Sequence, residues 1–321
     1  MGKILQSRDI DYLVSPFNYA DRTLGSGLLL EHVPLASVYA HGKAFFEEND
    51  LYTDTGRPDG DFRGGNISIG VAETWEETLA YLRLSFGQAI IRGKHQWFAE
   101  LAGWLGEFKE NFSNPRYLDE VRHLNDRADE LLIRDRRSVT ELAFVLDEKS
   151  VAHLTLDHKG FLKHVYRASV SWGHTGAPFD LVLLEDLVEN RCPPYRLVVP
   201  ACVKISESID RLREWLGRTS TRAWWDGTPE WYPPVDAAAL IGRMEGAGVH
   251  RYIAEDATAW ANASMVLIHV AEPGMHTIRF RRPCGGMEFF SNQKFDAPSG
   301  DCDWPFETNG TALFLIESQA V

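Results

Sequence analysis

The chain has 321 residues, of which 44% are hydrophobic, and its 33 Lys and Arg against 46 Asp and Glu give a net charge of −13. This length supports two or three domains with real cores, and the acidic balance disfavours nucleic acid or an anionic membrane as the main partner. The four cysteines form no CxxC pair and have no His at metal-ligand spacing, so we expect neither a metal site nor a disulfide framework. Because no apolar run reaches about 18 residues and the N-terminus lacks a signal-peptide core, we expect a cytoplasmic protein with no membrane partner.

The first segment, residues 1–137, alternates strand-like apolar runs with amphipathic helices. Thr74 is the expected N-cap of the first long helix, with Glu77 as its capping-box partner. The order is typical of βα units, in which the loops after strands carry function. The expected elements are strands at 10–16 and 36–48, a helix at 72–93, a short element at 96–106 and a helix at 114–134.

The charged stretch 132–141 is the expected linker, because the strand pattern restarts directly after it. Residues 138–254 then alternate strands and helices as in a doubly wound parallel α/β domain. Residues 255–321 lack helical periodicity and predict a small antiparallel β domain. In the middle segment we expect strands at 141–147, 179–187, 196–203, 220–225 and 249–254, and helices at 160–176, 206–217 and 235–248.

Two features suggest carbohydrate chemistry. The 10 Trp often stand beside polar residues, as in "HQWFAELAGWLG" and "RAWWDGTPEWYPP", and sugar sites pair aromatic rings with polar side chains in this way. In "KAFFEENDLYT", Glu47 and Glu48 follow an apolar run. They are either catalytic carboxylates at a strand end or polar residues that solvate the place where a strand stops.

Three blocks of the first segment resemble the last three strand-and-loop units of the (β/α)8 barrel in β-galactosidases of glycoside hydrolase family 42. They are "DIDYLVSPFNYADRTLGSG", "HGKAFFEENDLYT" and "QWFAELAGWLG". The stretches "ELAFVLDEKS", "GAPFDLVLLEDL" and "PPYRLVVPACV" are similar to the glutamine-amidotransferase-like domain that mediates oligomerisation there, and "AWANASMVLIHVAEPGMHTIRF" resembles the small C-terminal β domain.

The resemblance implies an α/β fold in three parts. Residues 1–137 would be the C-terminal part of a TIM-barrel glycosidase domain. Residues 138–254 would be a flavodoxin-like, class I amidotransferase-like trimerisation domain, and residues 255–321 a small β-sandwich domain. The implied partners are a carbohydrate substrate and further copies of the same chain, since relatives are often trimers, and no cofactor is implied.

The same resemblance assigns site residues. Glu48 matches the nucleophile of a retaining glycosidase. Tyr52 stands where relatives usually have Arg, and Glu100 stands where Asp is expected, so both positions depart from the family. The residues implied to bind substrate are Tyr19, Arg22, Lys43, Asp50, Trp97, Glu100 and Trp104.

A retaining glycosidase needs a second carboxylate about 5 to 5.5 Å from the nucleophile. In relatives this acid/base follows the fourth barrel strand, but only 47 residues precede Glu48. Three βα units cannot close an eight-stranded barrel, and an open sheet edge needs a partner. We therefore expect catalysis only if an upstream barrel half completes the site. Asp11, Glu31 and Glu100 are the carboxylates that the chain itself offers instead.

Two alternatives stay open. The chain could be a non-catalytic oligomerisation or carbohydrate-binding module built from its second and third segments. It could also be an amidotransferase with Cys202 as nucleophile, although no Gly-x-Cys-x-Gly turn surrounds this residue and no His-x-Glu follows it.

Overall fold

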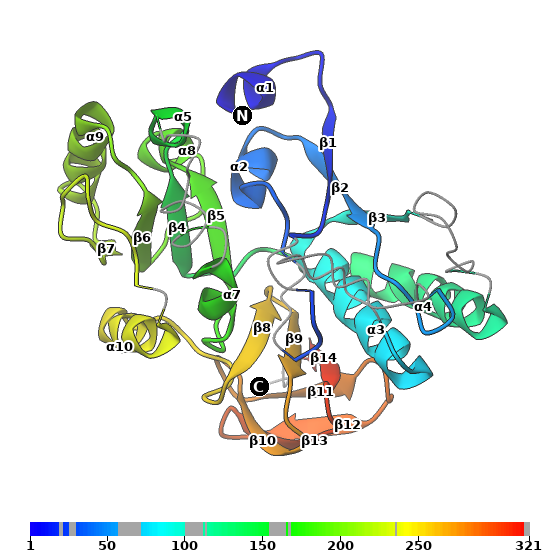
Figure 1. The fold of residues 1–321 in the computed structure, drawn as a ribbon. Helices are drawn as coiled ribbons and strands as arrows, with labels where there is room; N and C mark the ends of the chain where they lie inside the picture. The colour runs from blue at the N-terminus through cyan, green and yellow to red at the C-terminus, as the bar shows by residue number, and fades with distance from the viewer. Residues whose placement is uncertain are drawn as a thin grey trace.

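The computed structural model describes residues 1–18, 22–25, 30–56, 72–99, 112, 114–153, 165, 168–234 and 236–317. Figure 1 shows three bodies of structure around one centre. A four-stranded sheet with its helices lies on the left, a three-stranded sheet lies right of centre, and antiparallel strands lie at the bottom.

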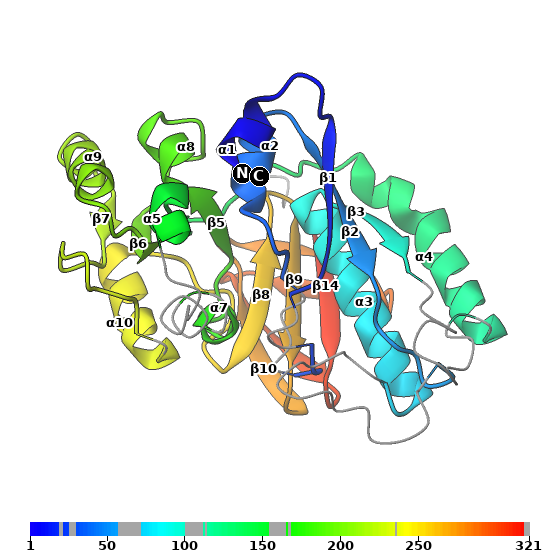
Figure 2. The ribbon, with the colours of Figure 1, turned by 45° about the horizontal axis from the view of Figure 1, so that its top comes forward.

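The first body is a parallel sheet in the order β1-β2-β3, with helices between and after its strands. Figure 2 shows the three strands side by side with α3 running alongside. The elements are α1 (Gly2–Gln6), β1 (Tyr12–Pro16), α2 (Leu35–Ala40), β2 (Ala44–Asn49), α3 (Trp75–Arg92), β3 (His95–Phe98) and α4 (Pro115–Leu132).

The two long helices of this body are confirmed, and so is the N-cap of α3. The Thr74 side chain accepts a hydrogen bond from the Glu77 amide, as a capping box requires. The return bond differs from the expectation, because the Glu77 carboxylate accepts from the Glu73 amide, one residue earlier. At the other end, Gly93 takes a left-handed conformation (φ 72°) that ends the helix just before β3.

The strand expected at 36–48 is wrong in its first half, which forms the short helix α2. Val38 and Tyr39 favour a strand by composition, but tertiary packing overrides that preference. Val38 is fully buried beside Phe45 of β2, and the Ser37 hydroxyl accepts a bond from the Leu183 amide of β5. The helix thus joins the first body to the second.

The second body is a four-stranded parallel sheet in the order β5-β4-β6-β7. Its elements are β4 (Leu142–Leu146), α5 (Glu148–His153), α7 (Ala168–Gly173), β5 (Phe179–Leu183), α8 (Leu184–Val188), β6 (Leu197–Cys202), α9 (Ser206–Leu216), β7 (Arg222–Ala223) and α10 (Ala237–Ala247).

Helices bury both faces of this sheet. Ala143 and Val145 belong to a cluster with α8 and α9, whereas Leu142 and Phe144, on the opposite face, pack with residues of α7 and α10. The strand expected at 249–254 is wrong: this stretch is irregular, with the Tyr252 amide donating to the Gly176 carbonyl.

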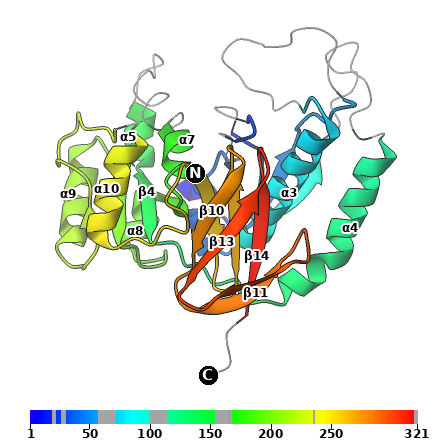
Figure 3. The ribbon, with the colours of Figure 1, turned by 90° about the horizontal axis from the view of Figure 1, so that it is seen from below.

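The third body is antiparallel, with one sheet in the order β12-β11-β14-β9-β8 and the pair β10-β13. Figure 3 shows these strands between the second body and helices α3 and α4. The strands are β8 (Ala257–Ala261), β9 (Met265–Val270), β10 (Gly274–Arg279), β11 (Cys284–Glu288), β12 (Lys294–Ala297), β13 (Asp301–Phe306) and β14 (Thr311–Glu317).

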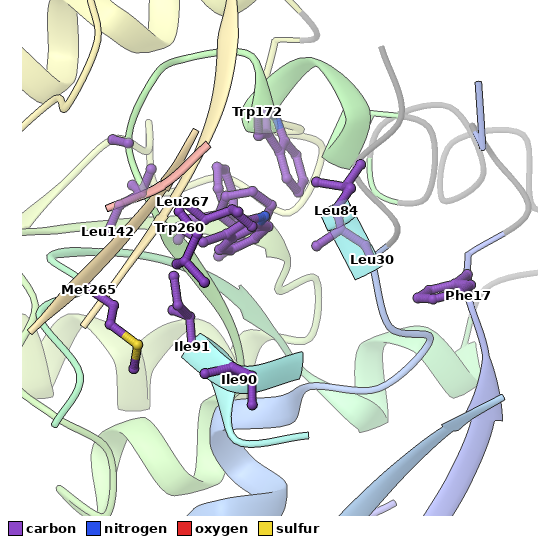
Figure 4. Packing of buried hydrophobic residues seen from close by; sticks show 14 of the residues in the cluster. Phe17, Leu30, Leu84, Ile90, Ile91, Leu142, Trp172, Trp260, Met265 and Leu267 are labelled. Carbon is purple, nitrogen blue, oxygen red and sulfur yellow. The ribbon is translucent and has the colours of Figure 1, made fainter. Parts of the chain in front are cut away.

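One hydrophobic core joins all three bodies. It includes Leu84 of α3, Trp172 of α7, and Trp260 and Leu267 of the antiparallel sheet, several of which Figure 4 shows converging. Helix α3 lies close to β9 because Gly87 has no side chain: a Cβ there would come within 2.6 Å of a Leu267 methyl group. The three bodies therefore cannot separate without exposing shared apolar surface.

None of the helices in the described ranges is both long and apolar enough to cross a lipid bilayer.

Candidate active site

One face of the three-stranded sheet is covered and the other is open. The covered face carries Phe45 and Glu47, both fully buried. Phe45 packs with residues of α2, and Glu47 is bonded to Lys94, which also donates to Gln88 of α3. The open face carries Tyr12 (55% exposed), Val14 (47%) and Trp97 (44%). Side chains alternate between the two faces of a strand, so Glu48 lies on the open face.

Glu48 occupies the carboxyl-terminal end of β2. It lies beside Pro16 of β1 and Trp97 of β3 in the sheet register, so a carboxylate and an indole are neighbours on one face. Glu48 is half-buried, and partial burial raises its pKa, with the Asp50 charge adding to the rise and the Arg22 charge opposing it. In this environment the Glu48 carboxyl group takes up and releases its proton at a pH above the usual range for a glutamate.

Arg22 and Asp50 form a buried ion pair next to Glu48. One Arg22 nitrogen donates to Asp50 Oδ1 at 2.6 Å, the other donates to the Phe17 carbonyl at 2.7 Å, and the guanidinium carbon lies 6.0 Å from the Phe17 ring. The Tyr81 hydroxyl donates to the Arg22 carbonyl and so fixes the backbone of this loop. Tyr52 stands where the resemblance leads us to expect Arg, but Arg22, from the segment after β1, supplies a guanidinium beside the carboxylates.

Glu47 belongs to a separate charge cluster on the covered face. Lys94 Nζ lies 2.6 Å from a Glu47 oxygen and 3.3 Å from a Glu31 oxygen, and Arg92 Nε lies 2.8 Å from Glu31. Burial raises the pKa of Glu47 to about 7 against the attraction of Lys94, and the Glu31 charge adds to the rise. Arg92 and Lys94 hold the pKa of Glu31 below its usual value despite its burial. Both carboxylates are therefore tied to structural cations and turned away from the open face.

The structure brings four of the expected site residues to one end of the sheet: Arg22, Glu48, Asp50 and Trp97. Lys43 is not among them, because it precedes β2, and its ammonium group donates to the Ser7 carbonyl at 2.6 Å. Five residues of extended strand separate Lys43 from Glu48, about 16 Å. Tyr19, Glu100 and Trp104 lie outside the described residues.

His32 is a neighbour of the site that sequence reasoning missed. Partial burial and the Arg22 charge lower its pKa, and the Asp50 charge opposes this. Its position follows from the isolated bridge between Phe17 and Glu31, which folds the segment after β1 back over the sheet end. No local motif marks this histidine, since its partners are distant in sequence.

The structure gives less support to two other kinds of chemistry, nucleophilic attack by Cys202 and metal binding. Cys202 is fully buried, and desolvation raises the pKa of its thiol to about 11, so the reactive thiolate is disfavoured. Within the described ranges, no three His, Cys, Asp or Glu side chains gather in a way that could hold a metal ion.

The chain matches no protein-family model and no curated protein sequence. Its fold is similar to solved structures of β-galactosidases. One is a family 42 enzyme from G. stearothermophilus, with a TM-score of 0.54, 9% identity, and coverage of 98% of this chain and 60% of that one. The chain shares its fold with part of the family 42 β-galactosidases.

Two further structures show how broad this likeness is. A β-galactosidase from Halorubrum lacusprofundi matches with a TM-score of 0.51 and 13% identity over 95% of this chain and 63% of that one. A rhamnosidase from Novosphingobium matches with a TM-score of 0.50 and 8% identity over 97% of this chain and 35% of that one. The chain thus spans about 60% of the length of the β-galactosidases, consistent with a C-terminal portion.

Proposed function

We propose that this chain carries the nucleophile of a retaining glycoside hydrolase that acts on β-glycosides, with β-galactosides as the first class to test. The observation that carries the proposal is Glu48, which lies on the open face at the carboxyl end of a parallel strand, beside Trp97 and next to the Arg22–Asp50 pair. In βα barrels this end of the strands holds the chemistry.

In this role the Glu48 carboxylate would attack the anomeric carbon of the sugar as the glycosidic bond breaks, and the aglycone would leave with a proton from the acid/base. Water would then hydrolyse the covalent glycosyl intermediate and restore the proton to the acid/base. The Trp97 ring offers an apolar surface for the face of the pyranose. Asp50, held by Arg22, offers a fixed acceptor for a sugar hydroxyl. Because attack needs the ionised form of Glu48, and the pKa of this group is raised, the rate should fall on the acid side from a pH above 4.5.

The acid/base carboxylate would come from a further set of βα units that completes the barrel. Three observations support such a completion: the apolar side chains on the open face, the parallel edges of β1 and β3, and the 60% coverage of the matching β-galactosidase. Asp50 is the one carboxylate in the described ranges whose charge raises the pKa of Glu48, and Arg22 already engages it. It is therefore a poor acid/base.

The test is hydrolysis of an aryl β-galactoside by the chain joined to whatever coding sequence lies upstream of the Met1 codon. Glu48→Gln should lower kcat by at least about a thousandfold, about 4 kcal/mol in the barrier. Asp11→Asn, an exposed carboxylate at the opposite end of the sheet, should leave the rate unchanged. Equal rates in wild type and Glu48→Gln would overturn the proposal.

A second candidate is a non-catalytic module that assembles as a homo-oligomer, such as a trimer, or binds carbohydrate. It is favoured by the engagement of Asp50 with Arg22, which leaves Glu48 without a second working carboxylate in the described ranges. Light scattering of the purified chain measures the assembly, and galactoside binding that Glu48→Gln does not alter would support this candidate.

A further inference from the structure

A cavity of about 360 Å³ lies where the three bodies of the molecule meet. Its lining comes from α2, the end of α3, the segment after α4, β5 and the loop after α8, and β8. Tyr39 and Arg92, which line it, come just before β2 and β3, so the cavity lies toward the amino ends of those strands. Glu48 lies at their carboxyl ends, so the cavity is separate from the candidate active site.

The lining is unusually basic for a protein of net charge −13, with three arginines and one aspartate. Arg92 is paired with Glu31 and lies 4.3 Å from the Trp260 ring, and Arg191 is paired with Glu189 at 2.5 Å. Arg136 lies at the exposed rim of the cavity, and no ion pair or hydrogen bond with another described residue is found for it. It is the lining cation whose charge no neighbouring carboxylate offsets.

Two hydrogen-bond donors in the cavity wall also lack an acceptor among the described residues. They are the Tyr39 hydroxyl and the Trp260 indole N–H, and both atoms are buried. Such groups are uncommon because each costs about 1–3 kcal/mol when left unsatisfied. Glu31, Arg92, Glu47 and Arg136 are the charges that act on the Tyr39 hydroxyl, Arg136 the least of the four, so this cation lies within reach of the donor.

We propose that this cavity binds a small organic anion whose carboxylate or phosphate group faces Arg136 and Tyr39. A planar guanidinium is the side chain best suited to either group. The body of the ligand would pack on the apolar part of the wall, formed by Leu35, Ile91 and Pro193. The volume is near the lower end of the range for small-molecule sites, which limits the ligand to roughly one ring.

A neutral sugar or a cation fits this cavity less well. Both need acceptors, and Asp180 is the one carboxylate in the lining. It already accepts from the Tyr195 hydroxyl at 3.1 Å and lies 3.9 Å from Arg92.

Isothermal titration of the full chain with three probes tests the proposal: inorganic phosphate, a hexose 6-phosphate and benzoate. We expect one of the two organic anions to bind at one site per chain. Comparing the hexose 6-phosphate with benzoate shows whether the site prefers a phosphate or a carboxylate group. Arg136→Gln should weaken binding about tenfold or more, the usual loss for a charged hydrogen bond. Tyr39→Phe, which removes a hydroxyl without a described partner, should keep the fold and weaken binding several-fold.

Arg137→Gln is the matched control. Arg137 is the next residue, is exposed and is paired with Asp135, and it does not line the cavity. Its replacement should leave binding unchanged. The proposal is overturned if neither organic anion binds below about 10 mM, or if Arg136→Gln and Arg137→Gln weaken binding equally. The measurement needs no glycosidase activity, so its failure is distinguishable from failure of the proposed function.

Discussion

The two parallel sheets of this protein have the same kind of strand pairing but differ in how they are covered. In the four-stranded sheet, Phe144 and Val145 of one strand are both fully buried, because helices cover both faces. In the three-stranded sheet, helices cover one face, and Tyr12 and Val14 are about half exposed on the other. Parallel sheets normally bury both faces. The open face of the three-stranded sheet is where the proposed further βα units would pack, and the candidate nucleophile Glu48 lies on that face.

The largest expected effect on stability comes from a substitution in the core of the four-stranded sheet. Phe144 is stacked on Trp172 with ring centroids 3.7 Å apart, and both are fully buried. Phe144→Ala should lower the free energy of unfolding by about 4 kcal/mol because it leaves a cavity. Val14→Ala, on the open face, should change it by less than about 0.5 kcal/mol. Urea unfolding measures both. If Val14→Ala lowered the free energy of unfolding as much as Phe144→Ala does, the open face would have to be covered in solution.

The covered face of the three-stranded sheet depends on Lys94. Lys94→Met should cost about 3 kcal/mol, because removing one partner of a buried ion pair leaves Glu47 without its cation. The surface pair of Arg122 and Asp119 provides the contrast, and Arg122→Ala should cost under about 1 kcal/mol. Urea unfolding at pH 7.5 compares the two variants. Equal losses would show that the Glu47 cluster is hydrated.

The contact between the first body and the antiparallel sheet should depend on pH. His269 is fully buried, accepts a hydrogen bond from the Gly25 amide at 2.9 Å, and has its pKa lowered to about 4 by burial. Since the folded pKa lies below the unfolded value of 6.5, this stability is present above pH 6.5. It is lost as the pH falls toward 4, by up to about 3 kcal/mol.

Unfolding free energies at pH 7.5 and 5 measure this effect. His269→Gln should reduce the difference between the two values, and His123→Gln, on the exposed face of α4, should preserve it. An unchanged difference in His269→Gln would assign the pH dependence to other groups.

The smallest expected effect on stability is at the N-cap of helix α3. Thr74→Ala removes the side-chain acceptor of the Glu77 amide at the start of α3 and should cost about 1 kcal/mol. Thermal unfolding of this variant beside Thr228→Ala, in an exposed turn, measures it. Equal losses would argue against the cap.

Sequence reasoning worked where a local pattern decides the structure. The apolar spacing of α3 and its Thr74 cap are readable from neighbours three and four residues apart. It failed where distant contacts decide. The helix α2 has strand-like composition, and its burial depends on Phe45 and Leu183. The expected strand at 249–254 has the right composition, but its Tyr252 amide is taken by the Gly176 carbonyl.

The candidate site shows the same division. The block "HGKAFFEENDLYT", which resembles family 42, identified Glu48. Because side chains alternate along a strand, Glu48 and Glu47 lie on opposite faces of the sheet. The pairing of Arg22 with Asp50 joins residues 28 positions apart, and the Lys94–Glu47 bridge spans 47. Neither pairing leaves a local signal. The resemblance placed both Arg22 and Asp50 in the site, but it did not imply that they pair with each other.

The central claim is that Glu48 forms the covalent bond to the sugar. The most direct measurement is mass spectrometry of peptides from the completed enzyme after reaction with a 2-fluoro β-galactoside, whose glycosyl intermediate breaks down slowly. The account predicts one added sugar on the peptide that contains Glu48, and none in Glu48→Gln. A label on a different carboxylate in an active enzyme, or labelling that persists in Glu48→Gln, would contradict it.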